Sequence, residues 1–146
     1  MTHHRCGKGF NWKGISVLAY KEEGSHFKAI SRRILFEGSK RIKAQLRYFE
    51  IAPAGYSTLE RHEHIHVVII QRGAGRALVG SEILSLRPFD IVEIAPNVWH
   101  QFQASNRGPF GFLCLVNSVR DRPHRPDASE LARLRENPGI AGFIKV

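Results

Sequence analysis

The chain has 146 residues, of which 42% are hydrophobic and 24% charged, a composition that is typical of a folded globular protein and excludes a disordered one. Two cysteines are too few for a disulfide framework, and no apolar run approaches the ~20 residues of a membrane span, so we expect a cytoplasmic protein without a membrane segment. Lys and Arg outnumber Asp and Glu by 22 to 13, for a formal charge of +9; the basic residues are scattered, which favours a small anionic ligand over nucleic acid.

Short alternating or apolar segments recur along the chain, separated by turn residues about every 8–12 positions, which is typical of a sandwich or barrel. The strands are predicted at residues 14–20, 31–36, 46–53, 66–71, 76–79, 82–86, 90–95, 100–104 and 110–116. Pro53 is expected to end its strand, and Gly80-Ser81 reads as a two-residue hairpin turn.

Only the last part of the chain has a helical pattern. Asp127 can cap a helix, Glu130 follows three residues later, and Pro138-Gly139 is expected to end it. The sequence therefore predicts an all-β protein with one short C-terminal helix. We expect a loose N-terminal segment at 1–13, a barrel at 14–118 and a C-terminal extension at 119–146.

The segment Glu60-Arg-His62-Glu-His64-Ile-His66 carries the clearest chemical signal. With a period of two, its carboxylate and three imidazoles project from one face if the backbone is extended. Burying four such side chains is costly unless a divalent metal takes their lone pairs. His100 is the outstanding candidate for a ligand from elsewhere in the chain. The predicted ligands are Glu60, His62, His66 and His100, with the alternative that His64 replaces one of them.

These residues resemble the motifs of the cupin family. The run from Pro53 to His66, followed by Gly73-Ala-Gly75, resembles the first cupin motif, and Phe89-Asp90 with Pro96-Asn-Val-Trp-His100-Gln-Phe resembles the second. The resemblance covers about residues 45–118 and implies a single cupin β-barrel, or jelly roll. Counting back from Gly73 places the glutamate of the family motif at His66 and its two histidines at Glu60 and His62. The ligand types are therefore permuted here, and His64 is an additional member.

A narrower resemblance is to the cupin methylsulfurylases, which act in methylthioadenosine salvage. It rests on Thr58-Leu-Glu-Arg-His-Glu-His-Ile-His, Trp99-His-Gln-Phe, Gly111-Phe-Leu-Cys and Arg120-Asp-Arg-Pro. It implies a transferase that removes the methylthio group of 1-methylthio-xylulose 5-phosphate, with glutathione as acceptor and 1-deoxyxylulose 5-phosphate as product. The implied metal is manganese, or another divalent ion such as iron, nickel or zinc.

Within this resemblance, Cys114 is the candidate nucleophile and His64 the candidate proton donor to C1. A cysteine in an apolar strand is more often an inert core residue, and the alternation around Cys114 does not decide which way it faces. If it faces the metal, we expect nearby cations to lower the pKa of its thiol. The pair Arg32-Arg33, or Arg47, is a candidate to hold the phosphate.

Two other classes of function fit the same residues. One is a different cupin metalloenzyme, a sugar isomerase or a dioxygenase, that makes no use of Cys114. The other is a non-catalytic cupin that binds a small molecule. A homodimer is expected in each case, with the edge segment 14–20 in need of cover.

Overall fold

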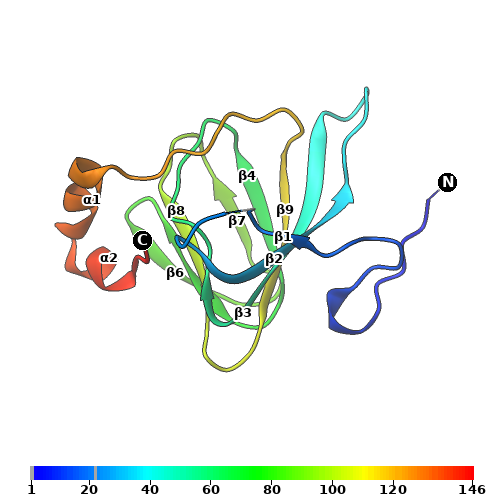
Figure 1. Cartoon of the computed structure of the whole chain (residues 1–146), viewed down its shortest axis with the longest axis horizontal. Helices are drawn as coiled ribbons and strands as arrows, with labels where there is room; N and C mark the ends of the chain where they lie inside the picture. Colours follow the sequence, from blue (N-terminus) through cyan, green and yellow to red (C-terminus); the bar gives the residue numbers. More distant parts are fainter. Residues whose placement is uncertain (1, 22) are drawn as a thin grey trace.

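The computed structural model describes residues 2–21 and 23–146, and it is a curled antiparallel sheet that closes into a barrel. The barrel lies between an N-terminal segment on one side and two short helices on the other (Figure 1). The strands are β1 (Leu18–Ala19), β2 (Lys28–Phe36), β3 (Ala44–Tyr56), β4 (His66–Arg72), β5 (Gly75–Val79), β6 (Glu82–Leu86), β7 (Ile91–Ile94), β8 (His100–Ala104) and β9 (Phe110–Asn117).

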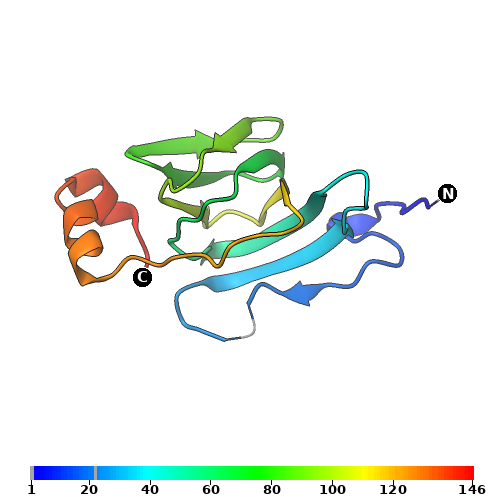
Figure 2. The same ribbon diagram turned by 90° about the horizontal axis from the view of Figure 1, so that it is seen from above.

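The long strand β3 belongs to both halves of the barrel. It pairs with β2 on one side and with β9 on the other, and the order continues through β4 to β7. Its last residue, Tyr56, pairs with Gln103 of β8, from which β5 and β6 follow. Figure 2 shows the green strands lying over the long light-blue strand β2. The all-β barrel predicted from the turn spacing is therefore confirmed.

Among the predicted strand boundaries that differ from the structure are the one at Pro53 and those of the segment 14–20. The strand that was expected to end at Pro53 continues to Tyr56, because the proline lies in a bulge where β3 leaves its register with β2. Ala54, with φ of 59°, makes the turn inside this bulge, and its N–H donates to the carbonyl of Ser105. Of the segment predicted as a strand at 14–20, only Leu18–Ala19 pairs in the sheet.

The barrel interior is filled by one apolar cluster. Phe49 and Phe102 each pack against Phe112, with ring centroids 5.5 Å and 4.7 Å from it. Fully buried aliphatic side chains from facing strands, among them Ile51 and Ile70, complete the cluster. This core fixes the strands whose ends carry the polar site described below.

The C-terminal extension contains two helices, not the one that was predicted. α1 (Ala128–Arg135) begins at Asp127, which forms the expected capping box with Glu130. Pro138 does not end the helical region; it occupies the first turn of α2 (Pro138–Phe143), whose N-cap is Asn137. None of the helices in the described part of the chain is long and apolar enough to cross a membrane.

The second helix seals one side of the barrel. Ile140 and Phe143 are buried against Leu59 and Leu78. The chain then returns to β8, where the fully buried side chain of Gln101 donates to the carbonyl of Lys145 and accepts from its N–H. These bonds tie the end of the chain to the residue after His100.

The N-terminal segment covers the outer face of β2 and β3. Phe10 stacks on Tyr48 with ring centroids 5.4 Å apart, and Trp12 meets the same ring edge-on. Asn11 accepts hydrogen bonds from Arg33, which lies over the Tyr48 ring.

Candidate functional site

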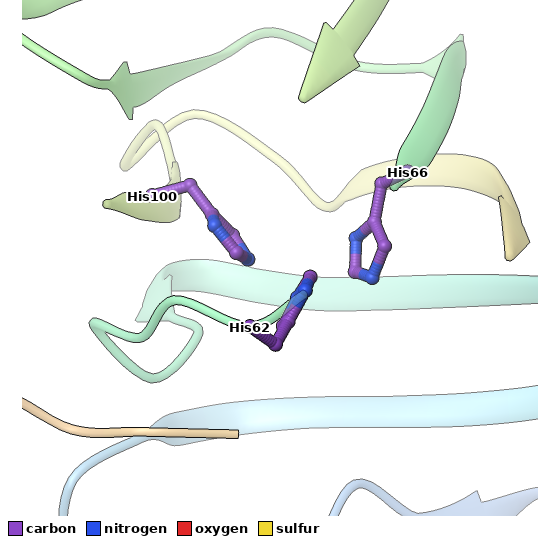
Figure 3. Close-up of side chains that lie close together, drawn as sticks. All are labelled: His62, His66 and His100. Carbon is purple, nitrogen blue, oxygen red and sulfur yellow. The ribbon is translucent and has the colours of Figure 1, made fainter. Parts of the chain in front are cut away.

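Three imidazoles converge inside one end of the barrel, as predicted for His62, His66 and His100. His62 comes from the connection between β3 and β4, while His66 and His100 are the first residues of β4 and β8. Their rings point toward one another in Figure 3, and the ligand-type atoms of the three all lie within 4.8 Å of one another. The backbone of Glu60 pairs with that of His100, which brings His62, two residues later in the chain, close to His100.

Hydrogen bonds to the backbone fix two of these rings. Nδ1 of His62 lies 2.8 Å from the carbonyl oxygen of His64, and Nδ1 of His100 lies 2.9 Å from that of Val98. A carbonyl only accepts, so each Nδ1 carries the proton and each Nε2 presents a lone pair. The Nε2 atoms of His62 and His66 are buried without a hydrogen-bond partner among the described residues.

All three imidazoles are held in the neutral form. Burial lowers the pKa of His62 to about 4, with further lowering by His100 and His64. Burial likewise lowers the pKa of His66, with His100 and His62 adding to it, and burial lowers the pKa of His100. Neutral imidazoles with free, buried lone pairs are what a divalent transition metal requires, so these residues fit the predicted ion.

His62, His66 and His100 line one cavity of the barrel. Glu60, the predicted carboxylate ligand, lines this cavity too, but it lies outside the cluster of three imidazoles. It is buried, and its Oε2 accepts from Nζ of Lys21 at 2.6 Å. The structure therefore places the carboxylate beside the histidines and pairs it with an ammonium group. Lys21 carried no signal in the sequence, because the two residues are 39 positions apart.

His64 stacks on His62 with ring centroids 3.6 Å apart and nearly parallel planes. The backbone bends at Glu63 and His64, so the segment is not the continuous extended strand that was considered from its alternation. The bend turns Nδ1 of His64 to Asp121, which also accepts from the N–H groups of Glu63 and His64. Burial works to raise the pKa of the Asp121 carboxyl, but these hydrogen bonds hold that pKa well below its usual range.

Asp121 is a site residue that the sequence reasoning missed. It stands between two arginines in Arg120-Asp-Arg-Pro, a stretch that contributed to the resemblance but gave the aspartate no role. Its carboxylate accepts from the backbone N–H of His64 and lies against Nδ1 of the same residue, so it fixes the orientation of this imidazole.

Cys114 faces the interior, where it lines the same cavity of about 220 Å³ as the histidines. Register places it opposite Val68 on β4 and opposite Arg47 on β3. Burial raises the pKa of its thiol to about 12, a direction opposite to the lowering that was expected, although Arg47 and Arg120 oppose that rise. Formation of a thiolate at Cys114 therefore requires stabilisation by the neighbouring arginines and a group that accepts the proton of the thiol.

The sequence matches the family described as Cupin domain over residues 47–116. The chain is 46% identical over 136 residues to 1-methylthio-D-xylulose 5-phosphate methylsulfurylase of Rhodospirillum rubrum, an alignment that covers 92% of this chain and 86% of that protein.

Solved structures agree with the fold. A cupin 2 conserved barrel domain protein of Rhodopseudomonas palustris superposes with a TM-score of 0.94 at 42% identity, covering 99% of this chain and 100% of that one. A cupin-2 domain protein of Rhodospirillum rubrum gives 0.87 at 43% identity, covering 93% of this chain and 91% of that one.

Proposed function

The chain belongs to the cupin family, and from this premise we propose that it is a metal-dependent methylsulfurylase acting on 1-methylthio-xylulose 5-phosphate. The observation that carries the proposal is that Cys114, His64 and the three convergent histidines line one cavity. The proposal is further supported by the name of the R. rubrum relative, which is 46% identical over most of the chain.

The proposed metal ligands are His62, His66 and His100, with Glu60 as the carboxylate. The unpartnered Nε2 atoms of His62 and His66 and the lowered pKa of all three imidazoles support the three histidines. The buried position of Glu60 beside them supports the fourth ligand. A manganese or similar divalent ion held there would act as a Lewis acid toward the keto-sugar carbonyl and stabilise negative charge that develops next to it.

Cys114 is the proposed nucleophile. Its thiol loses a proton, and the sulfur attacks the sulfur of the methylthio group. The bond between that sulfur and C1 breaks, and its electron pair stays on the sugar as an enolate. Cys114 is left as a mixed disulfide with the methylthio group, which one molecule of glutathione releases as a second mixed disulfide while the Cys114 thiol is restored.

His64 is the proposed proton carrier. The thiol gives up one proton and C1 gains one, so the sugar leaves as 1-deoxyxylulose 5-phosphate without any change in the total number of protons. Asp121 keeps the His64 ring in one orientation through its bond to Nδ1. This leaves Nε2 as the nitrogen that exchanges a proton with the substrate.

A cytoplasmic location belongs to the same proposal, because the cytoplasm supplies glutathione in its reduced form. A homodimer that covers the edge segment 14–20 remains a prediction.

The test is to incubate the purified protein, after elemental analysis, with 1-methylthio-xylulose 5-phosphate in the presence and absence of glutathione. Thiol-dependent formation of 1-deoxyxylulose 5-phosphate and a glutathione methyl disulfide in equal amounts supports the proposal. An isomerised sugar that keeps its sulfur, oxygen uptake with bound iron, or binding without turnover would overturn it in favour of an isomerase, a dioxygenase or a binding protein.

A further inference from the structure

Three arginines from separate elements line the same cavity as the histidines. They are Arg32 on β2, Arg47 on β3 and Arg120 after β9. Arg32 lies opposite Phe49, a residue of the barrel core, and Arg47 lies opposite Cys114, so strand alternation directs both side chains inward.

The neighbouring Arg33 shows that this placement is selective. It lies opposite Tyr48, and its Nε and Nη2 both donate to Asn11 on the outer face of the barrel. The candidate phosphate pair Arg32-Arg33 is therefore divided between the two faces of the sheet, and only Arg32 reaches the cavity.

The inward arginines have unused donors. Arg47 is only 9% exposed, yet its Nη2 has no hydrogen-bond partner among the described residues, and neither has the buried Nε of Arg32. Within residues 2–21 and 23–146, none of the three guanidinium groups forms a salt bridge with a carboxylate. Burial of a guanidinium without its partners is costly unless a ligand supplies the acceptors.

Repulsion among the three adds to this cost. Burial lowers the pKa of Arg47 to about 10, and Arg120 and Arg32 lower it further. Burial also lowers the pKa of Arg120, and Arg32 adds to that effect. A bound anion would reduce the repulsion among the guanidinium groups and would compensate for the hydration that they lose on burial.

A buried amide holds two of the guanidinium groups in place. Oε1 of Gln45 accepts from Nε of Arg47 and, at 3.1 Å, from Nη1 of Arg120. The amide nitrogen of Gln45 in turn donates to Glu37 at 2.7 Å, which fixes the orientation of the amide. The cluster is therefore organised before any ligand arrives.

We propose that Arg32, Arg47 and Arg120 form the subsite for the phosphate of the sugar phosphate, in the cavity that Cys114 and the histidines also line. The inference rests on the proposed function for the identity of the sugar. A phosphate monoester carries close to two negative charges and three acceptor oxygens, which match several convergent guanidinium donors. The single charge of a carboxylate would leave most of the positive charge of this cluster uncompensated.

The test compares two ligands that differ only in the phosphate, 1-deoxyxylulose 5-phosphate and 1-deoxyxylulose, by calorimetry on the metal-loaded protein. Arg32→Met, Arg47→Met and Arg120→Met are each expected to weaken binding of the phosphorylated sugar by about 10–100-fold, as for a lost hydrogen bond to a charged group, and to leave the other sugar unaffected. Arg87→Met is the matched control, because that side chain is 86% exposed and lies away from the cavity.

Arg120 is an exposed residue, so its variant tests the proposal even if the buried Arg47 variant does not fold. In the activity assay, the KM for the sugar phosphate should rise in the arginine variants, and the KM for glutathione should stay constant. Wild-type affinity for the phosphorylated sugar in Arg120→Met and Arg32→Met, or a rise confined to the KM for glutathione, would overturn the subsite.

The two proposals can fail separately. Arginine-dependent binding of the phosphorylated sugar without turnover would remove the methylsulfurylase assignment and keep the subsite. Turnover that is unchanged in all three arginine variants would remove the phosphate subsite and keep the methylsulfurylase assignment.

Discussion

Nδ1 of His64 lies 2.5 Å from Oδ1 of Asp121, although 57 positions separate the two residues along the chain. This bond gives the imidazole one orientation while its ring stacks on His62. If His64 carries the proton to C1, His64→Gln should lower kcat by about 10²–10⁴-fold, the usual contribution of a general acid or base. The metal content of the variant, measured by elemental analysis, should equal that of the wild type. Loss of the metal would instead make His64 a ligand.

Replacement of the Cys114 sulfur by oxygen keeps the shape of the side chain and removes most of its nucleophilicity. Cys114→Ser is therefore expected to retain the fold and the metal while kcat falls by orders of magnitude. Cys6, which is exposed, provides the control, since Cys6→Ser should keep wild-type turnover. Without glutathione, mass spectrometry of the wild type should find one methylthio group on Cys114. Near wild-type turnover of Cys114→Ser would leave this residue as core packing and make glutathione the attacking thiol.

His62→Ala removes one of the three convergent ligand atoms together with a ring that contacts His64, His66 and His100. We expect it to lose the metal, and we expect manganese to raise the melting temperature of the metal-free wild type but not that of this variant. His3→Ala, at an exposed histidine outside the cavity, should behave as the wild type in both measurements. Retention of one equivalent of metal by His62→Ala would contradict the proposed centre.

Glu60→Gln separates the role of the carboxylate as a ligand from its pairing with Lys21. An amide keeps the shape but is a poor ligand, so metal affinity should fall by about 10–100-fold without being abolished. Calorimetric titration of the metal-free protein with manganese measures the change in affinity. Unchanged affinity would assign Glu60 to the Lys21 pair alone.

The metal-free protein should lose stability in mild acid. The pKa of His62 is about 4 in the folded state against 6.5 for a free imidazole, so between these values the unfolded chain binds a proton that the folded chain does not. The free energy of unfolding therefore falls as the pH drops through this window, by roughly 3 kcal/mol for this residue alone. His66 and His100, whose pKa values are also lowered, act in the same direction.

Urea denaturation of the metal-free protein at about pH 7 and about pH 5 measures this effect. His62→Gln should show a smaller difference between the two midpoints, because its side chain does not titrate. Equal midpoints for the wild type at the two pH values would show that the buried rings are not held neutral.

The histidine cluster could be predicted because its signal is local. His62 lies four residues before His66, the first residue of one strand, and His100 follows a turn as the first residue of another. The hairpin at Gly80-Ser81 could also be predicted from local residues, and the structure has this two-residue turn between β5 and β6, with Val79 opposite Glu82.

The partners of these residues could not be predicted, because their positions depend on how distant segments pack. Lys21 reaches Glu60 across 39 positions and Asp121 reaches His64 across 57. Charged residues of both signs are frequent in the chain, and no spacing rule selects one of them.

The second helix was missed for a different reason. Pro138 was taken as a terminator, but a proline also suits the first turn of a helix, where its missing N–H would have no partner. Asn137, which caps α2 by accepting from the N–H groups of Gly139 and Ile140, was the signal that distinguishes the two readings.

The bonds of Gln101 make the last residues of the chain part of the barrel. If Lys145 detached, the amide of Gln101 would lose both its bonds to that residue and keep only those to the Ser57 carbonyl and the Gln103 amide, at a cost of about 1 kcal/mol for each lost bond. The C-terminal tail therefore does not fray independently. Hydrogen exchange at the Lys145 amide should be slow for a position one residue from the end of the chain, and it reports on the integrity of β8 beside His100.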